Sequence, residues 1–140
     1  MDANGGQLSG DGSKIYVTVD QLEGTYAIVS SAEPLGIRDL RLHPNPFSPH
    51  NGGQLTFDFR LTSDQSSRPN LSIKIYNMAG QLVRALIRSE DMEKGTLLRR
   101  WWNGTTDDGR MARNGRYVVV MIVKDSSDEV KEIRTVVLVK

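Results

Sequence analysis

Two histidines are the side chains of this chain best suited to acid–base chemistry, and they flank a proline-rich loop. His43 stands at the start of that loop and His50 at its end, in a chain without cysteine. Nucleophilic catalysis needs a nucleophile within reach of a base, and a third group that orients the base. The serines and aspartates around the two histidines are not spaced to suggest such a set. We therefore expect a protein that is not an enzyme.

A short acidic stretch offers oxygen ligands for a hard cation. Asp107 and Asp108 follow Asn103 and Thr105, and all four side chains carry oxygen donors of the kind that Ca²⁺ accepts. Their spacing does not match an EF-hand loop, and an Asp-Gly turn explains both aspartates without a metal. The acidic residues at 125–129 are explained most simply by a solvated hairpin turn. We expect no metal and no other cofactor, with Asp107 and Asp108 as weak candidates.

Adjacent tryptophans lie in a predicted strand at residues 97–103. Because successive side chains of a strand point to opposite faces, Trp101 and Trp102 cannot both enter one core. The outer ring is expected either to lie under the N-terminal part of the chain or to be an exposed interaction surface. An exposed ring can stack on a sugar, which makes carbohydrate binding one alternative. Tyr117 begins a strand after an Asn-Gly turn, as does the tyrosine of a tyrosine corner.

Charge and composition exclude several classes of partner. The 140 residues carry 18 Lys and Arg against 17 Asp and Glu, and neither sign is clustered. Nucleic-acid-binding domains usually show a basic patch, so we expect no nucleic acid partner. No apolar run approaches the ~20 residues of a membrane helix, so we expect no membrane insertion. The first residues lack the features of a signal peptide, so we expect any export signal elsewhere in the chain or in a longer protein.

Residues 71–87 predict the β-hairpin around which the chain is organised. Leu71, Ile73 and Ile75 alternate with polar residues, residues 77–80 form a turn that ends in glycine, and residues 82–87 are a second apolar run. The other predicted strands have similar patterns. They lie at residues 39–43, 55–61, 97–103, 117–123 and 132–139. Residues 117–123 are all apolar, which predicts a central strand covered on both faces.

Seven short strands separated by polar turns, without a helical period, predict the fold class. It is an all-β, immunoglobulin-like (fibronectin III-like) sandwich of about seven antiparallel strands at residues 34–140. Residues 1–13 are a predicted flexible start, and residues 14–33 are a predicted hairpin and linker. That hairpin either docks on the sandwich or is the remnant of an upstream domain, which the linker-like residues 30–34 favour. Edge strands can pair with another chain, so self-association is one expected interaction, and the prolines of residues 44–49 should protect one edge.

Four segments resemble the C-terminal sorting domains of the bacterial type IX secretion system. They are residues 44–49 (Pro-Asn-Pro-Phe-Ser-Pro), the strand and turn at 73–83, the Gly-x-Tyr segment at 115–117, and the ending at 134–140. A fifth segment, residues 102–110 (Trp-Asn-Gly-Thr-Thr-Asp-Asp-Gly-Arg), resembles the immunoglobulin-like domain of flagellar hook-capping proteins. Asn103 stands where that family often has aspartate, which argues against a metal in this loop.

The resemblance implies a non-catalytic C-terminal module of a larger secreted or cell-surface bacterial protein. Its role would be secretion sorting or surface anchoring, and its partners the secretion machinery or neighbouring domains of the parent protein. The residues that would identify the fold are Asn45, Pro46, Tyr76, Gly80, Trp102, Gly109, Gly115 and Tyr117. From its place in the family segment, Trp102 is the tryptophan expected in the core. The residues that would carry sorting are Val136, Val137, Leu138, Val139 and Lys140.

The same resemblance leaves a second function class open. A structural scaffold, of the hook-cap type or as an accessory domain that orients an adjacent enzyme, would use the same fold. We therefore expect an extracellular or cell-surface location for the parent protein, with sorting as the leading role and scaffolding as the alternative.

Overall fold

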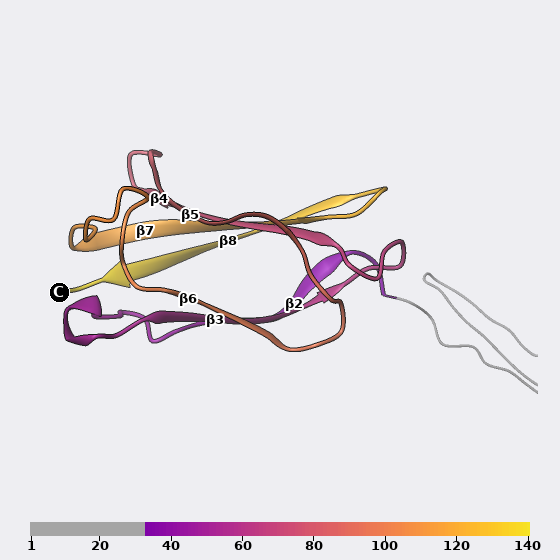
Figure 1. The fold of residues 1–140 in the computed structure, drawn as a ribbon, viewed down its shortest axis with the longest axis horizontal. Coiled ribbons are helices and arrows are strands. Elements are labelled where there is room, and N and C mark those ends of the chain that lie inside the picture. The colour runs from indigo at the N-terminus through magenta and orange to yellow at the C-terminus, as the bar shows by residue number, and fades with distance from the viewer. Residues whose placement is uncertain (1–32) are drawn as a thin grey trace, which may run out of the picture. The chain divides into compact units, whose positions relative to one another are not determined.

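The computed structural model describes residues 33–140, whose strands form two layers (Figure 1). The predicted flexible start and the predicted hairpin and linker lie outside the described residues, apart from Glu33. Residues 35–62 and 66–140 make up one compact unit. In this described part of the chain, no helix is long and apolar enough to cross a membrane.

The two layers are a three-stranded and a four-stranded sheet. The first has the order β2-β3-β6 and the second the order β5-β4-β7-β8, and all neighbours are antiparallel. The strands of the first are β2 (Gly36–His43), β3 (Leu55–Thr62) and β6 (Leu98–Trp102). The strands of the second are β4 (Asn70–Asn77), β5 (Leu82–Asp91), β7 (Gly115–Lys124) and β8 (Glu129–Leu138). This arrangement confirms the predicted immunoglobulin-like sandwich. A single 3-10 turn, η1 (Pro49–Asn51), is the only helix among residues 33–140.

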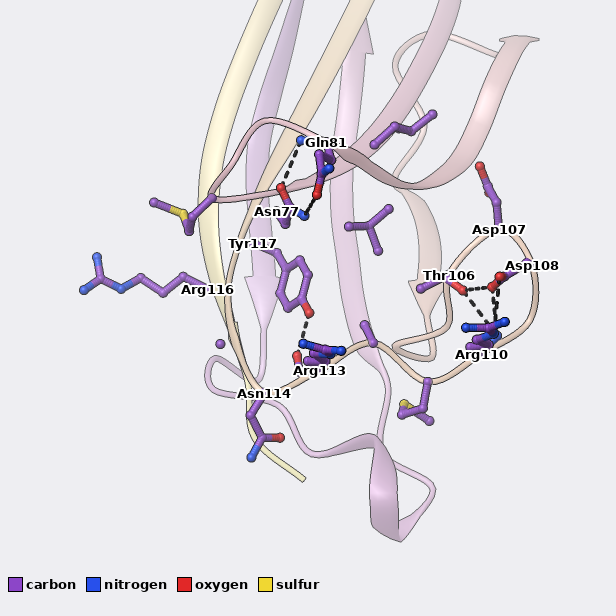
Figure 2. Close-up of a pocket in the computed structure, with 16 residues that line it drawn as sticks. Asn77, Gln81, Thr106, Asp107, Asp108, Arg110, Arg113, Asn114, Arg116 and Tyr117 are labelled. Atoms are coloured by element: carbon purple, nitrogen blue, oxygen red, sulfur yellow. Dashed lines mark hydrogen bonds and ion pairs between the residues drawn. The ribbon is translucent and has the colours of Figure 1, made fainter.

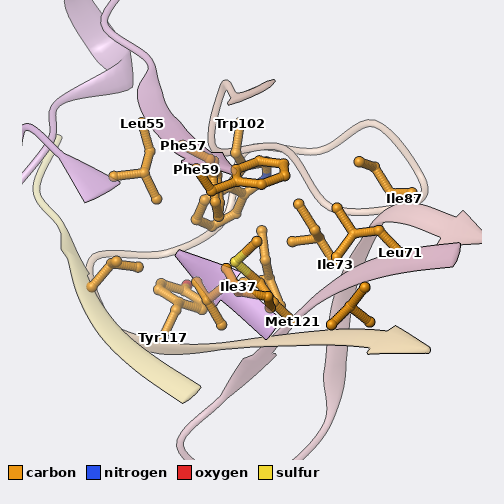
Figure 3. Close-up of a cluster of buried hydrophobic side chains, with 14 of the residues drawn as sticks. Ile37, Leu55, Phe57, Phe59, Leu71, Ile73, Ile87, Trp102, Tyr117 and Met121 are labelled. Carbon is orange, nitrogen blue, oxygen red and sulfur yellow. The ribbon is translucent and has the colours of Figure 1, made fainter. Parts of the chain in front are cut away.

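The core is the apolar layer between the two sheets (Figure 3). Alternation along β3 buries Leu55, Phe57, Phe59 and Leu61 completely, as their spacing predicts. The facing sheet contributes fully buried aliphatic residues from its two central strands. They include Leu71, Ile73 and Ile75 of β4, and Val119 and Val123 of β7. Each such side chain contributes about 1.5–3 kcal/mol relative to exposure in water.

Trp102 is the largest side chain in this core. Its ring centroid lies 5.3 Å from that of Phe47 and 5.7 Å from that of Tyr117, the latter in an edge-on arrangement. The indole N–H donates to the carbonyl oxygen of Thr105 at 2.8 Å, which satisfies the one polar atom of the buried ring. The prediction that Trp102 is the core tryptophan is confirmed.

The predicted organising hairpin is present as the pair β4–β5. β7 lies next to β4 and is a central strand, as predicted. The prediction that both of its faces are covered is wrong for residues 33–140, because these residues bury only its inner face. Its inner residues are buried, whereas Val118, Val120 and Ile122 on the outer face are only half-buried. Ile133 of β8, directly opposite Val120, is exposed. The composition of a strand reports its apolar content but not whether a partner layer exists.

β2 begins earlier than the predicted strand at 39–43, because an irregularity hides its pattern. The register with β3 shifts between Arg38 and Arg41, and Asp39 has a φ of 56°. A bulge of this kind breaks the two-residue alternation that identifies a strand in a sequence. Ile37, on the far side of the bulge, is buried in the core.

The proline-rich segment covers part of the edge of β8, as expected of residues 44–49. The Phe47 N–H donates to the Val137 carbonyl at 2.9 Å, and the Val139 N–H donates to the Phe47 carbonyl at 3.0 Å. The Asn45 side chain extends this pairing, because its amide donates to the Thr135 carbonyl at 3.2 Å and its oxygen accepts from the Val137 N–H at 2.9 Å. The side-chain amide of Asn45 thus makes the two hydrogen bonds to β8 that a peptide group of a neighbouring strand would make.

Asn45→Ala should open this edge. We expect the loss of two hydrogen bonds to lower the free energy of unfolding by about 1 kcal/mol and to favour self-association through β8. Thermal unfolding and size-exclusion chromatography measure the two effects. Gln54→Ala, which also removes an exposed side-chain amide, is the control and should change neither. An Asn45→Ala protein with unchanged stability and elution would show that the side-chain pairing is dispensable.

Candidate functional site

The segments that resemble known families contact one another at one end of the sandwich, where Asn77 pairs with Tyr117 and Leu138 pairs with Gly115 and Phe47. The turn after β4 is closed by Asn77, whose side-chain oxygen accepts from the N–H groups of Ala79 at 3.0 Å and Gln81 at 2.9 Å. Gly80 has a φ of 82°, which only glycine adopts without strain. Tyr76, just before the turn, is half-buried on β4. The contacts of Asn77 fix the turn that contains Gly80, directly after Tyr76.

The loop between β6 and β7 is tied both to itself and to β5. The Asp107 N–H donates to the Val83 carbonyl at 2.9 Å, and its carboxylate accepts from the Ala85 N–H at 3.0 Å. The N–H of Gly109 donates to the Thr106 carbonyl at 3.0 Å, which closes the predicted Asp-Gly turn. The loop therefore continues the edge of the four-stranded sheet beyond β5.

Both weak metal candidates accept hydrogen bonds from protein groups. Asp107 also lies 3.6 Å from a guanidinium nitrogen of Arg88. A hydrogen bond from the Thr106 hydroxyl, with a further one from the Arg110 N–H, lowers the pKa of Asp108 below its usual value. Among residues 33–140, no group of three or more His, Cys, Asp or Glu side chains is placed to hold a metal ion. The acidic turn near residue 125 closes on itself, because Asp125 accepts from the Ser127 N–H at 2.9 Å.

Tyr117 makes the contact expected of a tyrosine corner. Its hydroxyl donates to the Arg113 carbonyl at 2.5 Å, four residues back along the chain. Burial of the ring raises the pKa of Tyr117 above its usual value. Gly115 and Tyr117 lie at the start of β7, where Gly115 pairs with Leu138 of β8. The phenol of Tyr117 thereby holds the loop before β7 against the four-stranded sheet.

These segments enclose a pocket of about 850 Å³ (Figure 2). The turn at Asn77, the loop at residues 106–116 and the start of β7 form its walls. The described lining residues combine apolar side chains, such as Met78, Leu82 and Met111, with guanidinium groups and the carboxylates of Asp107 and Asp108. They therefore offer both apolar contact surface and charged hydrogen-bonding groups.

The predicted sorting residues divide into a buried and an exposed group. Val136 and Leu138 are fully buried in the core, and Val137 is half-buried. Val139 and Lys140 are exposed, and the Lys140 N–H donates to the Asn114 side-chain oxygen at 2.8 Å. Since Asn114 lines the pocket, Lys140 lies beside it.

A second polar cluster lies on the outer face of the three-stranded sheet, and sequence reasoning missed it. Asp58 is only 5% exposed and accepts from Arg99 at 2.6 and 3.2 Å and from His43 at 2.7 Å. The hydrogen bond from Arg99, then that from His43, lowers the pKa of Asp58 to about 2. The sequence suggested no acidic partner for His43, because this contact depends on how β2, β3 and β6 align. His50, by contrast, is exposed on η1.

Among known proteins, solved structures contain parts that are similar to this chain. No protein-family model and no curated protein matches the sequence. The chain is similar to part of dimeric latent PorU from Porphyromonas gingivalis, with a TM-score of 0.61 and 21% identity over 81% of this chain and 10% of PorU. It is also similar to part of PorZ, a surface component of the type IX secretion system of that organism, with a TM-score of 0.46 and 20% identity over 73% of this chain and 12% of PorZ.

The chain therefore spans about a tenth of the length of these structures. At this level of identity, the likeness to PorU concerns the fold. This chain shares its β-sandwich fold with one part of PorU.

Proposed function

We propose that residues 34–140 are a non-catalytic C-terminal module of a larger secreted or cell-surface bacterial protein, which serves secretion sorting or surface anchoring. The observation that carries this proposal is that the four segments resembling sorting domains contact one another at one end of the sandwich, through Phe47 with Leu138, Gly115 with Leu138 and Asn77 with Tyr117. PorU shares the fold of this sandwich. The partners we propose are the secretion machinery or neighbouring domains of the parent protein.

The exposed end of the chain is the part of the proposed sorting surface that a partner can reach. Val139 and Lys140 lie outside the core, whereas Val136 and Leu138 fill it. Deletion of residues 136–140 would therefore remove core packing together with the proposed signal. Substitution at the last two positions separates these effects.

Val139→Ser combined with Lys140→Ala should abolish export while the domain stays folded. The test fuses the whole chain to the C-terminus of a reporter, in a bacterium with a type IX secretion system, and measures the reporter in the medium. Ile133→Ser is the matched control, since it replaces another exposed apolar residue of the same strand region. Export of the double variant at the level of the unsubstituted fusion would exclude the last two residues as the signal. Equal export of a reporter without the chain would contradict the sorting role itself.

The alternative role, an accessory scaffold, is favoured by the outer face of the four-stranded sheet. Val118, Val120 and Ile122 are half-buried there, and Ile133 is exposed. An adjacent domain of the parent protein would cover such a face. In that case Ile133→Lys should weaken the association of the two domains, which limited proteolysis of the parent protein measures.

A further inference from the structure

The pocket between the turn at Asn77 and the loop at residues 106–116 is lined by several of the exposed apolar side chains of the domain. Among residues 33–140, seven large apolar residues are exposed, and three of them line this one pocket. They are Met78, Leu82 and Met111, with 62%, 46% and 40% of their surface exposed. Apolar surface gathered in a concavity is typical of interaction sites. Methionine suits such a site, because its unbranched side chain adapts to different partners.

Two arginines at the rim of the pocket form no ion pair with an acidic residue in the described part of the chain. Asp107 lies near Arg84 and Arg88, and Asp108 pairs with Arg110. Arg113 and Arg116 are exposed rim residues, and neither guanidinium has an acidic partner in the described part of the chain. In Figure 2 the Arg116 side chain extends outward from the rim. Guanidinium groups bind carboxylates with paired hydrogen bonds, so this rim favours an acidic ligand.

Both walls of the pocket are held in place without a ligand. The Asn77 side chain closes the turn on one side, and also donates to the Gln81 side chain at 2.9 Å. On the other side Asp107 fixes the loop to β5, because its N–H donates to the Val83 carbonyl and its carboxylate accepts from the Ala85 N–H. Tyr117 fixes the base of the loop through Arg113. A preformed site loses little conformational entropy on binding, which favours affinity.

We propose that this pocket binds an extended peptide segment of another protein, in which apolar side chains alternate with acidic ones. The apolar side chains would pack on Met78, Leu82 and Met111, and the carboxylates would bind Arg113 and Arg116. A sugar is a poorer match, because the only aromatic ring among the described lining residues, that of Tyr117, is buried. A nucleic acid shares the negative charge of the proposed peptide but lacks its aliphatic side chains, for which the pocket offers Met78, Leu82 and Met111. The proposal does not depend on sorting, since it holds for a scaffold domain as well.

The test uses fluorescein-labelled peptides of about ten residues, which span about 33 Å when extended. One alternates leucine with glutamate, a second leucine with lysine, and a third serine with glutamate. We expect saturable binding of the first peptide to the whole chain, measured by fluorescence anisotropy. The other two should bind at least about tenfold more weakly. Equal binding of the leucine–glutamate and leucine–lysine peptides, or no saturable binding of the first, would overturn the proposal.

Charge reversal locates the site on the protein. Arg113→Glu with Arg116→Glu should weaken binding of the leucine–glutamate peptide at least about tenfold, and Leu82→Ser should weaken it as well. Arg41→Glu is the matched control, since Arg41 is exposed on the other sheet, and it should leave binding unchanged. Unfolding midpoints verify that each variant is folded. Binding that survives the double reversal, or an oligonucleotide that competes as well as the peptide, would refute the assignment.

Discussion

Trp102→Ala is expected to lower the free energy of unfolding by about 3–5 kcal/mol, the largest effect of any single substitution in this domain. The ring is fully buried between Phe47 and Tyr117, so its removal leaves a cavity that rigid sheets cannot close. It also leaves the Thr105 carbonyl without its donor. Since single domains are stable by only about 5–15 kcal/mol, the variant should be close to unfolding. Urea denaturation followed by circular dichroism measures the change.

The neighbouring residue provides a control of identical chemistry. Trp101 is 52% exposed on the opposite face of β6, so Trp101→Ala should change stability by less than about 1 kcal/mol. Comparable losses for the two variants would mean that the two faces of β6 are assigned incorrectly.

Asp58→Asn is expected to have the second largest effect, and its size should depend on pH. The carboxylate joins three strands, because it accepts from His43 of β2 and Arg99 of β6 while belonging to β3. Asparagine occupies nearly the same volume but carries no charge, so the charge-assisted bonds to Arg99 become weaker. Thermal unfolding at neutral pH should therefore show a lower midpoint for the variant.

The pKa of Asp58 sets the range of this dependence. Its pKa is about 2 in the folded protein, against an ordinary value of 3.8. A lowered folded-state pKa stabilises the protein above the ordinary value, and the stabilisation is lost as the pH falls toward 2. The difference between the wild type and Asp58→Asn should therefore be present at neutral pH and shrink between about pH 4 and 2. Glu93→Gln, at an exposed position, should not alter this profile. A constant difference between the wild type and Asp58→Asn down to pH 2 would contradict the lowered pKa of Asp58.

Local patterns in the sequence were sufficient to predict most of the fold. The alternation of Leu55, Phe57, Phe59 and Leu61 depends only on neighbours along one strand, and the structure buries all four. Asp39 illustrates where local patterns fail, because the bulge there removes the alternation on which the prediction of a strand rests. The sequence contains no separate signal for that bulge.

The pocket and the polar cluster could not be predicted in the same way. Asp58 meets Arg99 across 41 positions of sequence, and the contact follows from the register of β3 with β6. Met78 and Met111 appear in the sequence as ordinary turn residues, and only the folded loops bring them to one pocket. Exposure is a property of the assembled surface, so the sequence could suggest the turns at Gly80 and Gly109 but not the space between them.

The attachment of the C-terminal strand has a mechanical consequence. Along β8, ten residues from Glu129 to Leu138 pair with β7, and Phe47 pairs with the last of them from the other side. A pulling force applied at Lys140 along the strand axis therefore loads both sets of hydrogen bonds at once, and they must rupture together rather than in sequence. Resistance to such a force is governed by the rate of forced unfolding rather than by equilibrium stability. We therefore expect this pairing to make β8 resistant to tension applied at Lys140.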